Sequence, residues 1–186
     1  MEKNNIVIDI ETLGRRNDAA ITQVGIVVAD SKFNVMEKYL IQVTPSAWHT
    51  CNRTFTGDTL LWWLKQNTLP YYDDNEDSED LRHTSSFLYA MDYKDLTEKI
   101  SKIFYDHNYN VDGTIVWTKG TMDLFCIKDL YEYFDKPTPW MFWQPRDIRT
   151  AKEFIKDWKT FEENTHNALS DAVNQLRELR ENLHKK

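Results

Sequence analysis

Short apolar runs alternate with amphipathic segments along the chain, and this pattern predicts a mixed α/β fold. Runs typical of strands lie near 5–11, 21–30, 35–43 and 114–119, with a further short one near 141–144. Helical periodicity predicts helices at 58–67, 92–107, 121–134, 147–157 and 167–184. Two hairpin-like strands follow the first one, and helices then alternate with strands. We therefore expect a central mixed five-stranded sheet flanked by helices, in a single domain spanning residues 1–186.

Two acidic residues interrupt the first apolar strand. Asp9 and Glu11 lie in the run from Asn5 to Gly14, and strand alternation places them on one face, about 6 to 7 Å apart. An ionised carboxylate in an apolar core is costly unless it has a partner, and a divalent cation is such a partner. The alternative is a strand end at which both acids reach solvent.

A third acid, Asp123, lies in the first turn of a predicted helix. On this helix Asp123 shares one stripe with Ile127, Leu130 and Phe134, so it lies on the side that faces the sheet. The helix dipole also favours an acid in a first turn. That alternative explains the position of Asp123 along the helix but not its place on the buried side.

A histidine precedes the last helix, which carries a fourth acid. Asn167 fits an N-cap, His166 falls in the loop just before it, and Asp171 lies in the second turn. The apolar stripe of this helix consists of Leu169, Ala172, Val173, Leu176 and Leu179. Taken singly, an ordinary surface histidine and a solvated helical acid explain these residues as well. Four acids and a histidine in this order point to a two-metal nuclease.

These residues resemble the motifs of the DEDD exonucleases, in the subgroup with a histidine five residues before the last acid. Asp9 and Glu11 match the first motif, Asp123 the second, and His166 with Asp171 the third. Further matching segments are Asp18–Ile21, Trp62–Gln66 and Phe142–Thr150, which are most similar to phage exonuclease A and the bacterial ribonuclease AS type. The second motif departs from the usual Asn- or Phe-containing versions, because Gly-Thr-Met precedes Asp123.

The resemblance implies a ribonuclease H-like fold and a hydrolase that removes nucleotides from 3′ ends. It implies two divalent ions, Mg²⁺ or Mn²⁺, with Asp9 shared between them, Glu11 and Asp171 on one ion and Asp123 on the other. His166 would be the general base, since imidazole groups titrate near neutral pH.

We expect the substrate to be the 3′ end of a single strand, because a flexible strand can enter a confined site whereas a duplex must first fray. The resemblance to phage exonuclease A favours DNA over RNA as the substrate. The resemblance to ribonuclease AS leaves a 3′-5′ exoribonuclease as an alternative. An exonuclease for short oligonucleotides is a second alternative. A nucleic-acid-binding module without turnover is an alternative of another class. A homodimer is left open.

Two tryptophans are candidates for base stacking. Five successive apolar residues, 60–64, would surround a helix, yet a surface helix buries only one stripe. We therefore expect one of Trp62 and Trp63 to face a cleft as a stacking platform and the other to pack in the core.

Further substrate contacts come from two places in the chain. Arg146 and Arg149 are candidates for holding phosphate oxygens, with salt bridges to the acid-rich surface as the alternative. The resemblance implies that Thr12 and Leu13, which follow the first motif, contact the last nucleotide.

Composition agrees with an intracellular globular protein. Cys51 and Cys126 are too few for a disulfide framework, and both are interpreted as reduced thiols. A signal peptide is not recognisable, and apolar runs stay short of membrane-spanning length. We therefore expect a cytoplasmic protein without membrane contact, in the host cytoplasm if it is encoded by a phage.

The net charge of −7 does not exclude a polyanionic substrate once it is apportioned. Residues 68–86 contain six acids and one arginine, a local charge of −5, and the four proposed metal ligands carry −4. The remaining residues carry +2. The overall acidity still argues against tight non-specific binding of duplexes. Segment 68–86 is interpreted as a solvated loop, with a mobile flap beside the cleft as the alternative.

Overall fold

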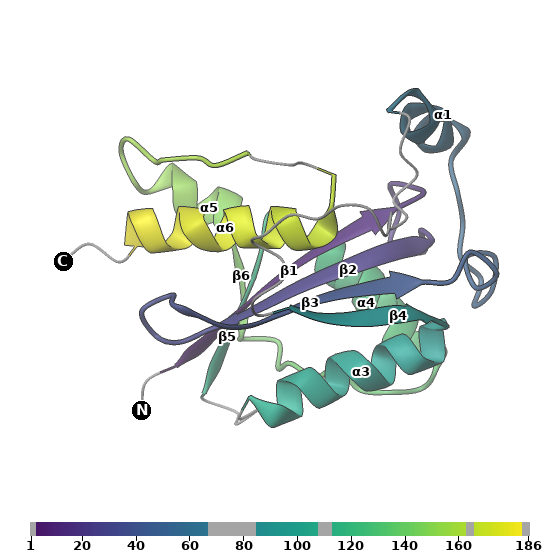
Figure 1. The fold of residues 1–186 in the computed structure, drawn as a ribbon, viewed down its shortest axis with the longest axis horizontal. Helices are drawn as coiled ribbons and strands as arrows, with labels where there is room; N and C mark the ends of the chain where they lie inside the picture. The colour runs from purple at the N-terminus through teal and green to yellow at the C-terminus, as the bar shows by residue number, and fades with distance from the viewer. Residues whose placement is uncertain (1–2, 67–84, 108–112, 163–165, 184–186) are drawn as a thin grey trace.

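A mixed sheet with helices on both faces forms the centre of the structure (Figure 1). The computed structural model describes residues 3–66, 85–107, 113–162 and 166–183. Within these residues the sheet has six strands in the order β4-β3-β2-β1-β5-β6, with bounds β1 Asn4–Thr12, β2 Ile21–Ala29, β3 Val35–Val43, β4 Ser85–Met91, β5 Thr114–Thr118 and β6 Pro145–Asp147. The described helices are α1 Gly57–Lys65, α3 Tyr93–Asp106, α4 Met122–Tyr133, α5 Ile148–Glu153 and α6 Ala168–Leu183.

The expected mixed sheet flanked by helices is confirmed, and so are the five predicted helices. The main difference among them is that α5 ends at Glu153 rather than at residue 157. After that point the backbone N–H groups of Phe154 and Ile155 bond to carbonyls three residues earlier, at 3.2 and 3.3 Å, so the chain leaves the helical spacing.

The sheet has one strand more than the sequence predicts, and one short strand lies elsewhere. The additional strand is β4, which pairs in parallel with β3 at the edge of the sheet. The strand expected near 141–144 is a correction, because Gln144 closes a turn there instead. Its backbone N–H bonds to the Met141 carbonyl at 3.0 Å, and its side chain accepts the Met141 N–H at 2.7 Å. Strand β6 therefore begins only at Pro145.

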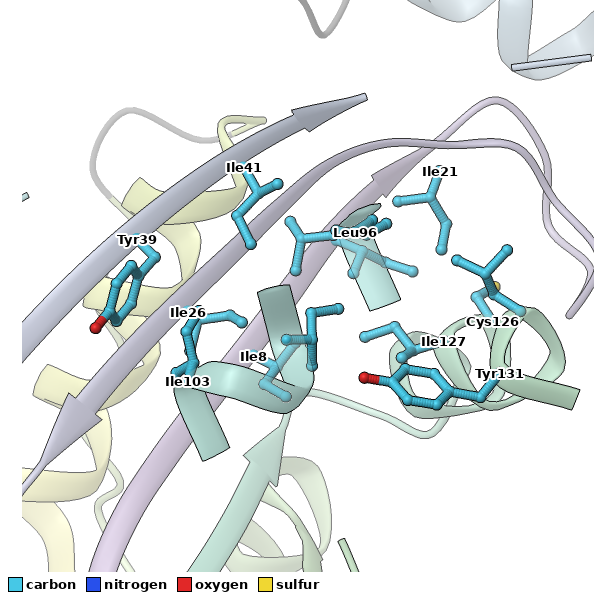
Figure 2. Packing of buried hydrophobic residues seen from close by; sticks show 14 of the residues in the cluster. Ile8, Ile21, Ile26, Tyr39, Ile41, Leu96, Ile103, Cys126, Ile127 and Tyr131 are labelled. Atoms are coloured by element: carbon cyan, nitrogen blue, oxygen red, sulfur yellow. The ribbon is translucent and has the colours of Figure 1, made fainter. Parts of the chain in front are cut away.

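Strand alternation divides the core between the two faces of the sheet. On β1, Ile6, Ile8 and Ile10 face α3 and α4, and Figure 2 shows Ile8 among residues from those helices. Val7 faces the opposite way, into the apolar cluster that α5 and α6 form with the sheet. Odd-numbered positions of β1 therefore face α6. Asp9 and Glu11 continue this odd-numbered series toward the end of the strand.

The end of β1 is open on one side. Strand β1 pairs with β2 as far as Thr12, with an irregularity between Glu11 and Thr12, but its pairing with β5 ends at Val7. The two acids thus lie beyond the point at which β1 and β5 separate. A crevice at such a point is where open α/β sheets commonly bind ligands.

Three expectations concern the rest of the chain. Cys51 and Cys126 are both free thiols, as expected, and Cys126 is buried. Within the described residues, none of the helices combines the length and apolar character needed to cross a bilayer. Most of the acidic segment expected as a loop or flap, 67–84, lies outside the described residues, and Ser85 and Ser86 belong to β4.

Candidate active site

Three carboxylates converge where the end of β1 meets the start of α6. Asp9 and Glu11 face α6 from the strand. Asp171 lies in the first turn of that helix rather than in the predicted second turn, because the helix begins only at Ala168. One oxygen from each of the three side chains lies within 4.8 Å of the others. Oxygen atoms at such separations match the ligand set of a hard divalent cation such as Mg²⁺ or Mn²⁺.

The approach of α6 to the sheet depends on a glycine. Gly25 on β2 pairs directly with Asp9, and a side chain there would lie 2.1 Å from the backbone oxygen of Ala168. The first residue of α6 is also fixed by a bond from its backbone N–H to the Gln23 side chain, at 3.3 Å. This close contact places Asp171 beside Asp9.

Asp123 reaches the same place from the other face of the sheet. It lies in the first turn of α4, whose residues Cys126, Ile127, Leu130 and Tyr131 are buried. Asp123 lines a cleft of about 660 Å³ together with Asp9, Asp171 and His166. Elements from both faces of the sheet therefore supply the cleft with acids.

Burial and mutual repulsion disfavour the charged forms of these acids. Burial raises the pKa of Asp9 well above its ordinary range, and the charges of Asp123, Glu11 and Asp171 raise it further. Burial also raises the pKa of Glu11 to about 8, with repulsion from Asp171 and Asp123. The pKa of Asp171 is raised by burial as well. A divalent cation bound among them would favour the ionised forms, so the donor set fits such an ion.

Cationic groups offset part of this repulsion. Burial raises the pKa of Asp123 to about 7, while backbone N–H groups and the Arg149 guanidinium act in the opposite direction. The Lys119 ammonium likewise opposes the rise in the pKa of Asp171 that burial causes. Both cations line the cleft.

His166 is held by its neighbour in the third motif. Its backbone N–H donates to Asp171 Oδ2 at 2.9 Å, and its φ of 70° lies in the left-handed region, where a histidine is uncommon. The expected N-cap at Asn167 is confirmed, because its side chain accepts the N–H groups of Leu169 and Ser170, both at 3.1 Å. Strained backbone at a candidate active site is a common way to orient a functional side chain.

The two tryptophans of α1 have different surroundings. Trp63 is 2% exposed and donates from its ring nitrogen to the Thr12 carbonyl at 3.1 Å. Trp62 is 37% exposed, and its ring lies edge-on to the His166 ring with centroids 4.7 Å apart. Trp62 is thus the exposed one of the two, and it lies against His166, which lines the cleft. The Leu13 side chain is 2% exposed and packs with Trp63, so only its backbone can reach a substrate strand.

The two candidate arginines lie in different hollows. Arg149 lines the acidic cleft, whereas Arg146 lines a neighbouring hollow and donates to the carbonyls of Trp143 and Pro145. Asp147 separates them in the sequence. As expected, it begins a helix by accepting the N–H groups of Arg149 and Thr150.

The sequence-based set lacks three polar residues at or next to the site, which are Lys119, Gln175 and Glu178. Gln175 is 3% exposed and donates to Asp9 Oδ1 at 2.6 Å. Glu178 is 1% exposed and pairs with Lys119 at 3.0 Å. The signal for both was present in the sequence, because Gln175 and Glu178 lie four and seven residues after Asp171, on the same side of a helix.

Comparison with known proteins supplies the family. Residues 4–183 match the model of the 3′-5′ exoribonuclease Rv2179c-like domain. The chain belongs to this family. A comparison with curated proteins finds no match. The expected kinship with 3′-5′ exonucleases is therefore confirmed at the level of this family, whereas the likeness to phage exonuclease A and ribonuclease AS stays a prediction.

Solved structures of exonuclease I share the fold of this exoribonuclease-family domain. A zinc-bound complex of the E. coli enzyme with single-stranded DNA matches with a TM-score of 0.66 at 15% identity, over 97% of this chain and 40% of that chain. An E. coli complex with a dT13 oligonucleotide matches with a TM-score of 0.62 at 15% identity, over 96% of this chain and 40% of that chain. This chain thus spans about two fifths of the length of these proteins. The expected ribonuclease H-like α/β fold is confirmed.

Proposed function

We propose that this chain is a divalent-cation-dependent 3′-5′ exonuclease acting on single-stranded nucleic acid. The observation that carries the proposal is the convergence of Asp9, Glu11 and Asp171 within 4.8 Å. Two of these acids, Asp9 and Asp171, line a cleft together with Asp123 and His166. The family match over residues 4–183 supports the same reaction.

The proposed ligands are the four acids, and the proposed cations are two ions of Mg²⁺ or Mn²⁺. Asp9 would be shared between the ions, Glu11 and Asp171 would complete the ligand set at the three-carboxylate cluster, and Asp123 would hold the second ion. When bound, two such ions supply charge neutralisation on both the attacking and the leaving oxygen. Gln175 keeps Asp9 in place through its 2.6 Å bond.

The proposed general base is His166. Its imidazole takes a proton from the attacking water as the water oxygen bonds to phosphorus, and the bond from phosphorus to the preceding 3′ oxygen breaks. That oxygen takes up a proton from solvent and becomes the 3′ hydroxyl of the shortened strand. The product is a nucleoside 5′-monophosphate. The bond from the His166 backbone to Asp171 and the contact of its ring with Trp62 limit the positions this imidazole can take.

RNA is the first candidate substrate, because the family that covers nearly the whole chain is described as exoribonucleases. DNA, which the sequence favours through phage exonuclease A, is the second candidate. It is supported by fold relatives solved with single-stranded DNA and a dT13 oligonucleotide. At the 3′ end, Trp62 is proposed to stack on the terminal base, Arg149 to contact its phosphate, and the Thr12–Leu13 backbone to contact its sugar.

The test is digestion of 5′-labelled RNA and DNA strands of one sequence with Mg²⁺ or Mn²⁺. We expect ladders that shorten from the 3′ end, and their lengths also show whether short oligonucleotides are preferred. Asp9→Ala should abolish hydrolysis, and His166→Ala should lower turnover by about 10²- to 10⁴-fold with little change in binding. Glu153→Ala, which removes an exposed acid of α5, is the matched control and should leave turnover unchanged.

Several outcomes would contradict the proposal. Release of the label as a mononucleotide would contradict the polarity. Full activity of Asp9→Ala or His166→Ala would contradict the assigned roles. Cation and strand binding without hydrolysis would favour the nucleic-acid-binding module instead.

A further inference from the structure

Two hollows continue the acidic cleft along one side of α4. The nearer one, of about 440 Å³, shares Gly120 and Thr121 with the cleft. The farther one, of about 910 Å³, shares Lys128 and Phe142 with the nearer one and extends to α3. Together these two hollows are named the upstream groove. Because neighbouring hollows share lining residues, the groove lies directly beside the candidate active site.

The upstream groove is positively charged although the chain is acidic. Its described lining carries four cations, Lys102, Lys128, Lys136 and Arg146, against two acids, Glu132 and Asp147, a net charge of +2. The whole chain carries −7. One of the two acids, Asp147, is already bonded to backbone N–H groups, including that of Gly120 at 2.9 Å. The groove therefore suits a polyanion better than the rest of the surface does.

Exposed aromatic rings lie among these cations. Phe142 is 90% exposed and lines both hollows, and Phe125 is 48% exposed and lines the nearer one. Phe142 is also in edge contact with Trp143, which is 42% exposed. Tyr105, 79% exposed, lines the far end. Rings interleaved with cations in a groove are the usual means of binding a single strand without sequence preference.

Ion pairs within the groove do not remove its charge for a ligand. Lys102 pairs with Asp106 and Lys128 with Glu132, each one helical turn apart, and Lys136 of the groove pairs with Glu98 of α3 at 3.3 Å. All six side chains are at least 31% exposed. Exposed pairs of this kind contribute roughly 0 to 1 kcal/mol. A phosphate can therefore replace the carboxylate as the partner of any of these lysines.

We propose that the upstream groove binds the nucleotides that precede the 3′ end of the strand. This inference rests on the proposed function, because it takes the strand's end to lie in the acidic cleft. Bases stack on Phe125 and Phe142, and phosphates contact Lys128 and Arg146. Helix α4 has 12 residues and so a length of about 18 Å, which accommodates about five stacked nucleotides.

The test compares strands that end within the cleft with strands that reach the groove. Fluorescein-labelled RNA of about three and about nine nucleotides is titrated by anisotropy into Asp9→Asn protein, in which turnover is removed. Phe142→Ala in that background should weaken binding of the longer strand by about 5- to 150-fold and leave the shorter strand unchanged. Lys128→Gln should also reduce the salt dependence of binding for the longer strand, by a slope of about 0.7.

The matched control is Phe154→Ala. Phe154 is 83% exposed, follows α5 and is outside the groove lining, so its loss should affect neither strand. In the active protein, Phe142→Ala should raise KM for the longer strand and leave KM for the shorter strand unchanged.

The outcomes separate this inference from the proposed function. If Phe142→Ala and its parent bind the longer strand equally well, the upstream groove does not bind the strand, even where hydrolysis is intact. A chain without hydrolysis that still binds the longer strand through Phe142 contradicts the proposed reaction but supports the groove. A dimer that Phe142→Ala converts to monomer, with unchanged strand affinity, overturns the groove in favour of an interface between copies.

Discussion

Substituting Gly25 tests whether the close contact of α6 with the sheet assembles the acid cluster. In Gly25→Ala the new carbon would lie 2.1 Å from the Ala168 oxygen, 2.2 Å from its carbonyl carbon and 2.5 Å from the Leu169 nitrogen. All three are backbone atoms, so rotation of a side chain cannot relieve the overlap. Either β2 or the first turn of α6 has to shift.

The size of the shift follows from the structure. Ordinary contact begins at 3.4 Å, so the contact with the Ala168 oxygen falls short by 1.3 Å. Asp171 lies three residues after Ala168, and Asp9 pairs with Gly25 across the strands, so the displacement acts directly on the cluster. A misplacement of about 1 Å in an active site costs about 10²-fold in rate.

Stability should fall as well, though less sharply. Overpacking of a tightly packed site costs about 1–3 kcal/mol. The reduced freedom of the unfolded chain on replacing glycine by alanine offsets about 0.4–1 kcal/mol of this cost. For a chain of this size, each kcal/mol corresponds to about 2–4 °C in Tm.

The assay pairs kcat on a labelled strand with thermal unfolding, and Gly57→Ala is the control. Gly57 is the first residue of α1, and an added carbon there meets nothing within 4 Å, so kcat should stay at the parent value. Its Tm should stay the same or rise by about 1–4 °C, because the reduced freedom of the unfolded chain is not offset by overlap. For Gly25→Ala we expect kcat to fall about 10²-fold with a lower Tm. A Gly25→Ala protein with parental kcat would refute the idea that this contact positions Asp171.

Three further predictions follow from individual residues of the site. Trp62→Ala should raise KM by about 5- to 150-fold at unchanged stability. Trp63→Ala should instead lower the free energy of unfolding, measured with urea, by about 3–5 kcal/mol. If both substitutions only lower stability, Trp62 does not stack on a base. Because burial raises the pKa of Glu11 from 4.5 to about 8, the folded protein binds this proton more tightly than the unfolded chain, so in EDTA the Tm should fall as pH rises through that range. Mg²⁺ or Mn²⁺ should accordingly raise Tm more near the upper end of that range than near the lower, and an equal increase at both would contradict this. Gln175→Leu should raise the Mn²⁺ concentration that gives half-maximal activity by about 10- to 100-fold. An unchanged midpoint would show that Asp9 does not need the hydrogen bond from Gln175.

The sequence by itself determined the elements and the order of the acids. Local periodicity sufficed for β1, β2, β3, β5 and the five described helices, because alternation on a strand and the stripe of a helix are properties of neighbouring residues. It also placed Asp9 and Glu11 on one face of a strand. Strand β4 escaped this reasoning because its place depends on pairing with the edge of β3, which lies far away in the chain.

Tertiary structure decided how these pieces meet. Sequence reasoning could not choose between Trp62 and Trp63 as the core residue, because that depends on the bond from Trp63 to Thr12 across the packed structure. It likewise missed the role of Gln175, whose partner Asp9 is 166 residues away. The approach of α6 to Gly25 is also a property of packed backbones rather than of local sequence. Periodicity fixes which way a side chain faces within its own element, and only packing decides which side chain of another element lies opposite.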